Sequence, residues 1–164
     1  MRLSPIVLAL GLVASSAAVP VQGQAPDDQI NPRSMALLKQ GETALAAGKF
    51  SDADDAFETA LAVDPRNRSA FIALGRTAQR QKLFGQAIRF YNKALALEPN
   101  DLDALTAQGT AMVELGALSR AKENLAKVQK ICASNCAQAT TLAAAIARGP
   151  TVAAIKPPPT PKSN

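Results

Sequence analysis

Residues 56–67, AFETALAVDPRN, and residues 90–101, FYNKALALEPND, match each other at a spacing of 34 positions. The residue pairs that share this spacing are Gly41 and Gly75, Ala53 and Ala87, Phe57 and Tyr91, Ala60 and Ala94, and Pro65 and Pro99. One further step reaches Gly109 and Ala121, but Leu125 then takes the aromatic position, Val128 replaces the second Ala, and no Pro follows. A fixed period of this length indicates a repeated pair of helices. The sequence therefore predicts three repeats, of which the third is atypical.

Each repeated residue type has a physical reason to be there. A Gly inside a helix costs about 1 kcal/mol relative to Ala, so we expect the three glycines to allow the paired helix to approach closely. The alanines keep the helix crossing narrow, and Phe57 and Tyr91 are expected to fill the wedge between one repeat and the next. The two prolines end the second helix of their repeats.

The turn signals between the repeated residues give the helix boundaries. We expect six helices at 34–47, 51–63, 68–81, 85–97, 102–115 and 119–132, with Ser51 and Ser119 as N-caps. A seventh helix is predicted from Cys136 to about Ala147, capped by Asn135 with Gln138 three residues later. Its apolar stripe of Leu142, Ala145 and Ile146 would cover the last repeat.

The order Gly, Ala, aromatic, Ala, Pro over residues 34–132 resembles the tetratricopeptide-repeat family. The resemblance implies an all-α, right-handed α-solenoid of three helix–turn–helix repeats at 34–67, 68–101 and 102–135, followed by a capping helix at 136–148. It also implies a protein-binding module that does no chemistry of its own. The C-terminal Cys-x3-Cys helix is similar to that of small exported bacterial members of the family.

In this family the first helix of each repeat lines a concave groove. The resemblance thus implies a partner-binding groove formed by Leu38, Glu42, Ile72, Arg76, Gln79, Arg80, Thr106, Thr110 and Val113. Ile72 with Arg76 and Arg80 would grip a peptide carboxylate, because Arg forms bidentate pairs with carboxylates. The alternative is that both Arg side chains face water, or pair with Glu42 or Glu114.

One group within the family binds chaperone tails through a clamp of Lys, Asn and Arg on the concave helices. The corresponding positions here hold Leu38, Glu42, Ala73, Asp103 and Ala107. We therefore expect no chaperone binding of that kind.

The composition of the 164-residue chain argues against catalysis. It contains no His, which removes the commonest general base and metal ligand, and two Cys are too few for a structural zinc site. The acidic group Asp52, Asp54 and Asp55 is explained by the dipole at a helix start. The net charge is +5, but no cluster of basic residues is interleaved with aromatic ones, so nucleic-acid binding is not expected. We predict no catalytic, cofactor-binding or metal-binding residue.

The two termini differ in composition from the repeats. Residues 1–23 carry Arg2, an apolar run at 6–13 and then small residues, which predicts a secretory signal peptide and a periplasmic or secreted protein. The alternative is an uncleaved membrane anchor over 3–21, which would make the chain a tethered, structural or self-associating domain. Residues 24–33 are predicted to be a flexible linker, and 149–164, containing KPPPTPK, a disordered Pro-rich tail.

Cys132 and Cys136 are predicted to flank the turn between the last two helices. Across a tight turn their side chains can meet, and an oxidising compartment favours a disulfide between them. Two alternatives are unpaired buried thiols and a redox-active pair.

Overall fold

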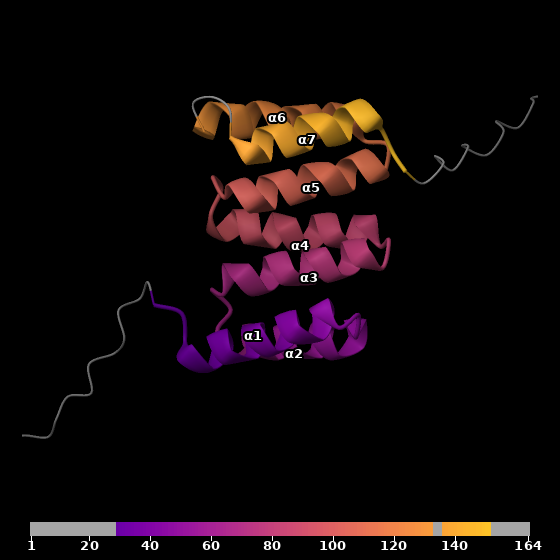
Figure 1. The fold of residues 1–164 in the computed structure, drawn as a ribbon. Coiled ribbons are helices and arrows are strands. Elements are labelled where there is room, and N and C mark those ends of the chain that lie inside the picture. Colours follow the sequence, from indigo (N-terminus) through magenta and orange to yellow (C-terminus); the bar gives the residue numbers. More distant parts are fainter. Residues whose placement is uncertain (1–28, 133–135, 152–164) are drawn as a thin grey trace, which may run out of the picture.

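The computed structural model describes residues 29–132 and 136–151, and within these ranges it contains helices and no strand (Figure 1). The helices are α1 (Pro32–Ala46), α2 (Phe50–Val63), α3 (Arg68–Arg80), α4 (Phe84–Leu97), α5 (Leu102–Glu114), α6 (Leu118–Cys132) and α7 (Ala137–Arg148). Each lies within two residues of its predicted bounds. None of the helices in the described part is long and apolar enough to cross a bilayer.

The helices pair in chain order and the pairs stack on one another. In Figure 1, α1 with α2, α3 with α4, and α5 with α6 form successive layers, and α7 closes the stack against α5 and α6. The predicted all-α architecture of three helix–turn–helix repeats and a capping helix is confirmed. The small buried alanines of the repeats, such as Ala53, Ala87 and Ala121, are 0% exposed and keep the helices of each pair close.

The repeated glycines accommodate a ring rather than the partner backbone. A Cβ added to Gly41 would lie within 2.9 Å of three ring atoms of Phe57, and one added to Gly75 within 2.8 Å of three ring atoms of Tyr91. Both rings are fully buried. The period of 34 residues therefore repeats a specific contact, in which the missing side chain makes room for the aromatic residue of the same repeat.

The third repeat replaces this contact in a way that the sequence did not predict. The atoms nearest to a Cβ at Gly109 belong to Leu142 of α7, at 2.7 and 2.8 Å, and not to Leu125. Leu125 instead packs, half-buried, in a small cluster with Leu105 and Val128. The capping helix therefore supplies the side chain that the last repeat lacks, and Leu142 is 0% exposed as a result.

Buried polar side chains link the two helices of the first repeat to the start of the second. The Ser34 hydroxyl donates to the Ala60 carbonyl oxygen at 2.7 Å, and the Asn67 side-chain amide donates to the Ser34 oxygen at 2.8 Å. Asn67 also caps α3 by accepting a hydrogen bond from the backbone N–H of Ala70. Because all of these groups are buried and hydrogen-bonded, they fix the orientation of the second repeat on the first.

The helix starts differ from the predicted N-caps. α2 and α6 begin one residue before Ser51 and Ser119, which places both serines inside their helices, where they cannot be N-caps. The N-cap of α7 is Cys136, whose sulfur accepts from the backbone N–H of Ala139, in place of the predicted Asn135. The predicted linker also ends early, because the Asn31 side chain caps α1 and Pro32 occupies its first turn.

The turns inside the repeats need a left-handed residue after the first helix. Gly48 and Gly116 have φ values of 73° and 76°. The second repeat has Lys82 at the equivalent place, with φ of 62°. A side chain in this region costs about 1–2 kcal/mol, which a glycine avoids.

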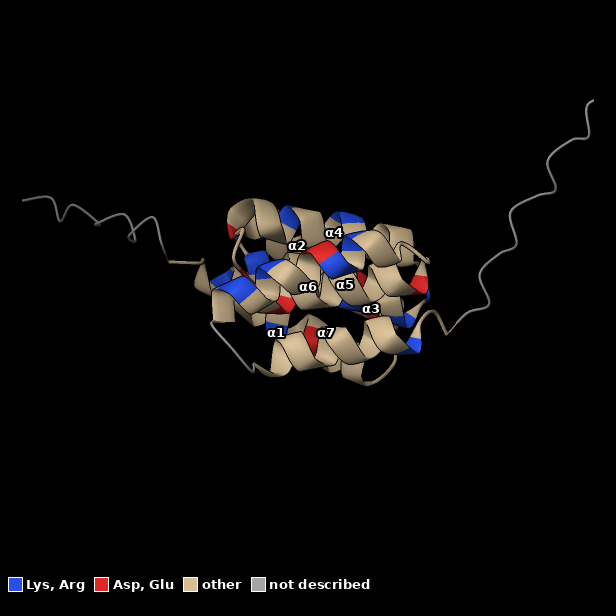
Figure 2. Ribbon diagram, turned by 90° about the horizontal axis from the view of Figure 1, so that it is seen from above, with Lys and Arg blue, Asp and Glu red and all other residues tan. Residues whose placement is uncertain are grey.

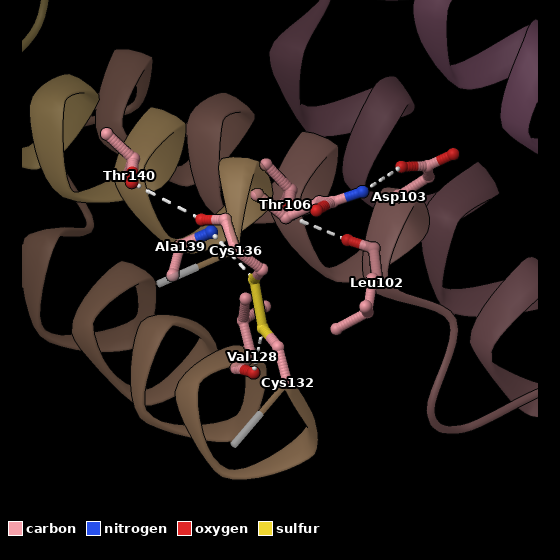
Figure 3. The surroundings of a disulfide bond; sticks show 9 residues. Leu102, Asp103, Thr106, Val128, Cys132, Cys136, Ala139 and Thr140 are labelled. Carbon is pink, nitrogen blue, oxygen red and sulfur yellow. Dashed lines mark hydrogen bonds between the residues drawn. A yellow bond between two sulfur atoms is a disulfide. The ribbon is translucent and has the colours of Figure 1, made fainter. Parts of the chain in front are cut away.

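A disulfide joins the end of α6 to the start of α7. Cys132 and Cys136 are bonded through their sulfurs, with their Cα atoms 6.0 Å apart (Figure 3). The side-chain amide of Gln138 donates to Asp103 of α5 at 3.3 Å, next to this bridge. The predicted signal peptide, nearly all of the linker, and the tail beyond Thr151 lie outside the described residues.

Candidate functional site

Three of the predicted groove residues are part of the packed interior. Leu38, Ile72 and Val113 are only 5%, 7% and 0% exposed, because they pack in the apolar clusters between layers. Thr106 is also largely buried, at 9% exposed, and its hydroxyl donates to the Leu102 carbonyl oxygen within α5, but it still lines one of the hollows described next. Neighbouring helices therefore already cover Leu38, Ile72 and Val113, and these three side chains line neither of the hollows described below.

Arg76, Gln79 and Thr110 do lie together, on the walls of two adjoining hollows over α3 and α5. The first hollow has a volume of about 550 Å³ and includes Arg80; the second has a volume of about 410 Å³. Glu42 is exposed on α1 but lines neither of them. We call the two hollows together the concave groove. The residues that line only the first are Leu45, Arg80, Lys82, Phe84, Glu114 and Thr151, and those that line only the second are Asp103, Thr106, Ala107, Ala137, Gln138 and Thr141.

The groove carries positive charge that the described part of the chain does not neutralise. Arg76 and Arg80 are exposed, and neither forms an ion pair with a carboxylate of the described residues. The guanidinium of Arg80 lies over the ring of Phe50, 6.0 Å from its centroid. The structure thus leaves both Arg side chains facing water, and neither pairs with Glu42 or Glu114.

Glu114 is engaged by the end of the described chain. Its carboxylate accepts hydrogen bonds from the Thr151 backbone N–H at 2.9 Å and from the Thr151 hydroxyl at 2.6 Å. Arg148 approaches the other carboxylate oxygen at 3.8 Å. The one acidic side chain in the first hollow is therefore partly neutralised, and that hollow remains basic through Arg76, Arg80 and Lys82, whereas Asp103 lines the second.

Gln79 is held in place by Tyr91, whose ring occupies the space left by the missing side chain of Gly75. The Tyr91 hydroxyl donates a hydrogen bond to the Gln79 side-chain oxygen. Burial raises the pKa of Tyr91, and this is partly opposed by the charge of Arg76, so the hydroxyl stays protonated and remains a donor. The repeated glycine–aromatic contact therefore also positions a side chain of the groove.

Leu45, Lys82, Phe84 and Thr151 are among the groove residues that the sequence did not predict. Lys82 could have been noticed, because a 34-residue step from Gly48 reaches a Lys where the turn requires glycine geometry. Leu45 gives no such signal, and Thr151 reaches the groove through a contact 37 residues from Glu114. Within the described ranges, no three His, Cys, Asp or Glu side chains gather closely enough to hold a metal ion.

The comparisons with known proteins agree with this geometry. A family model for the tetratricopeptide repeat matches residues 38–101. No curated protein is significantly similar to the chain.

Solved structures share the fold over most of the chain. The first tetratricopeptide domain of Spaghetti (RPAP3), bound to the HSP90 peptide SRMEEVD, is 25% identical with a TM-score of 0.65, covering 71% of this chain and 91% of that one. The TPR2B domain of yeast Sti1, in complex with an Hsp70 peptide, is 17% identical with a TM-score of 0.66, covering 72% and 98%.

An enzyme also contains a similar domain. The O-GlcNAc transferase of Thermobaculum terrenum is 22% identical with a TM-score of 0.62, and the match covers 70% of this chain but only 22% of the enzyme. That likeness is confined to a minor part of the enzyme and shows the fold alone. Together, the repeated glycine–aromatic contacts, the stacked helix pairs, the family model and the solved structures show that residues 38–101 carry tetratricopeptide repeats and that the described chain has the fold of tetratricopeptide-repeat domains.

Proposed function

We propose that the chain is an exported, non-enzymatic adaptor of the cell envelope, whose concave groove binds an acidic segment of a protein partner. The observation that carries the proposal is the pair Arg76 and Arg80, exposed in the groove with no carboxylate partner among the described residues. An Arg that meets a carboxylate makes two parallel hydrogen bonds, which give both affinity and orientation.

The walls around these two residues suit an extended peptide with an apolar side chain beside its acidic group. Leu45 and Phe84 line the first hollow with Arg76 and Arg80, and Lys82 adds a further positive charge. Non-glycine residues in strained backbone regions are concentrated at functional sites, which supports a role for the Lys82 side chain at the groove.

The partner differs from the peptides held by the solved neighbours. The first domain of Spaghetti (RPAP3) holds a peptide ending in EEVD. At three positions of the family clamp this chain has Leu38, Ala73 and Ala107, whose side chains cannot donate a hydrogen bond. Recognition here would depend on Arg76 and Arg80 instead, so we propose a different acidic segment as the ligand.

Export is the second part of the proposal and rests on residues 1–23 of the sequence. Its test is the N-terminal residue of the protein recovered from the cell envelope. A start near Val19 or Gln24 supports export with cleavage, whereas retention of Met1 favours the alternative, a tethered and self-associating domain.

Charge reversal tests the groove. We would capture partners from envelope extracts with the parent chain, with R76E/R80E, and with R89E/K127E. The control pair has the same change in charge but lies on the exposed faces of α4 and α6, away from the groove. A partner of the groove is retained by the parent and by R89E/K127E and lost from R76E/R80E. If R76E/R80E retains every partner that the control retains, the groove assignment is wrong.

A further inference from the structure

The two long edges of the stack differ in charge. The turns inside the repeats and the end of α7 lie along one edge, on the right of Figure 1. We call it the turn edge, formed by residues 46–52, 80–86, 114–120 and 148–151. The opposite edge holds the junctions between repeats, and we call it the junction edge, formed by residues 29–35, 63–69, 97–103, 130–132 and 136–138.

Three leucines protrude from the turn edge. Leu83, Leu115 and Leu118 are 47%, 54% and 36% exposed. Packing of the repeats does not require leucine at the first two positions, because the position of Leu83 holds Lys49 in the first repeat and Ala117 in the third. Leu115 likewise corresponds to Ala47 and Gln81. These leucines stand at the tips of neighbouring turns and do not line the groove.

Basic residues surround the leucines. The turn edge carries five basic residues, Lys49, Arg80, Lys82, Arg120 and Arg148, and two acidic ones, Asp52 and Glu114. In Figure 2, seen from above, this edge again lies to the right. Since Glu114 is bound by Thr151 and Arg148, its charge is already partly offset.

The junction edge is a natural comparison, because it also exposes three large apolar side chains. Met35, Leu97 and Ile131 are 44%, 44% and 38% exposed. Its charges balance, however, because it carries equal numbers of basic and acidic residues. The four basic ones are Arg33, Arg66, Arg68 and Lys130, and the four acidic ones are Asp64, Glu98, Asp101 and Asp103. Two of these acids are paired within the edge, Asp64 with Arg66 and Asp101 with Arg68. The edges therefore match in apolar exposure and differ in net charge.

We propose that the turn edge docks on the surface of an anionic lipid bilayer. Leu83, Leu115 and Leu118 would enter the boundary between headgroups and acyl chains, while the basic side chains lie among the headgroups. Each Lys or Arg near an anionic surface contributes about fivefold to binding. A row of protruding side chains suits a flat, deformable surface, and the charge of this edge complements anionic headgroups. The competing occupant is an acidic protein surface, which the test separates from a bilayer.

The chain contains no Trp, so a single Trp introduced by substitution reports on its own site alone. In the full chain, Leu115→Trp introduces a single Trp at the turn edge, and Leu97→Trp is the matched control at the junction edge. With phosphatidylglycerol vesicles whose acyl chains are brominated near the headgroup, the Trp of L115W is expected to shift to the blue and be quenched. It should stay unchanged with phosphatidylcholine vesicles, and the Trp of L97W should stay unchanged with both.

The position of the Trp keeps this readout informative even if residues 1–28 attach the chain to the vesicle. α1 begins at the junction edge, so attachment through the preceding residues would bring Leu97 toward the lipid, and not Leu115. Quenching at position 97 that equals or exceeds that at position 115 would overturn the proposal. So would an L115W Trp that anionic vesicles leave unquenched, which is also the result expected if an acidic protein is the true occupant.

A second set of variants tests the same surface by affinity. L83S/L115S/L118S should lose the quenching and blue shift of a lipid-inserted probe placed at Ser119→Trp, whereas M35S/L97S/I131S should keep them. K49Q/R120Q should weaken binding to anionic vesicles roughly 25-fold, at about fivefold for each charge removed. Equal behaviour of the two triple variants, each with the helical circular dichroism of the parent, would contradict the proposal.

Discussion

Replacing Gly75 with Ala adds one methyl group at the point where α3 meets the ring of Tyr91. The added Cβ would lie 2.6 Å from Cζ and 2.8 Å from Cδ1 of that ring, well inside ordinary van der Waals contact. Tyr91 is 0% exposed and its hydroxyl is hydrogen-bonded to Gln79, so the ring has no space into which it can turn. The substitution must therefore push α3 and α4 apart.

The size of the effect follows from two opposing contributions. Overpacking of a close-packed interior costs about 1–3 kcal/mol, and the rigid surroundings of Tyr91 place this site at the upper end. The better helix propensity of Ala returns about 1 kcal/mol. We expect G75A to lower the free energy of unfolding by about 2 kcal/mol.

Gly85 provides the matched control within the same repeat. It lies in the first turn of α4, and no atom outside its local backbone comes within 4 Å of an added Cβ. G85A should therefore raise the free energy of unfolding, by about 0.4–1 kcal/mol, through the reduced freedom of the unfolded chain. Urea unfolding followed by far-ultraviolet circular dichroism measures both. A G75A variant as stable as the parent, or a destabilised G85A, would refute the glycine–aromatic contact as the basis of the repeat.

Three further outcomes are expected, each measured by the free energy of unfolding. Lys82→Gly should stabilise the chain by about 1 kcal/mol, because Lys82 has φ of 62°, while G48A and G116A should destabilise it similarly; equal effects of all three would contradict the strain. C132S/C136S should cost about 2 kcal/mol, from the short loop that the disulfide closes, and reductant should lower the midpoint temperature of the parent but not of the variant. The side chain of Arg66, then the backbone N–H groups of Asn31 and Arg66, lower the pKa of Asp64 to about 2. Its contribution to stability is therefore complete above the unfolded pKa of about 3.9 and is lost as the pH falls through 2. Asp64→Asn should remove this dependence of stability on pH. A D64N variant whose stability falls as steeply as that of the parent between pH 4 and pH 2 would show that another group is responsible.

The helices could be predicted closely because each repeat marks its own boundaries. The 34-residue period aligns the prolines and the small residues, and the same contact recurs wherever Gly and an aromatic residue recur. The N-caps were less predictable. The backbone N–H of Ala53 bonds to the Lys49 carbonyl oxygen, so the aromatic residue of the turn, Phe50, is already the first helical residue and Ser51 comes too late to cap.

The groove could be predicted only in part. Helical periodicity indicates on which face of a helix a residue lies, but not whether that face is exposed in the fold. Arg76, Gln79 and Thr110, which the sequence predicts on one face of the first helices, line both hollows. Leu38, Ile72 and Val113 occupy the same side, but the next layer of the stack covers them, and their apolar character was the only warning in the sequence. Contacts across the end of the stack, such as Thr151 with Glu114, follow no period.

The replacement of an aromatic ring by Leu142 limits how such a chain can lengthen. A duplicated unit inserted between residues 67 and 68 would bring its own Gly and ring, so both of its neighbours would find the surfaces they already contact. A unit inserted after Cys132 would separate Gly109 from the leucine that fills it and leave an unfilled hole in the third repeat. Growth and shrinkage of the array are thus confined to its N-terminal part, and the final repeat and its cap must be inherited as one block.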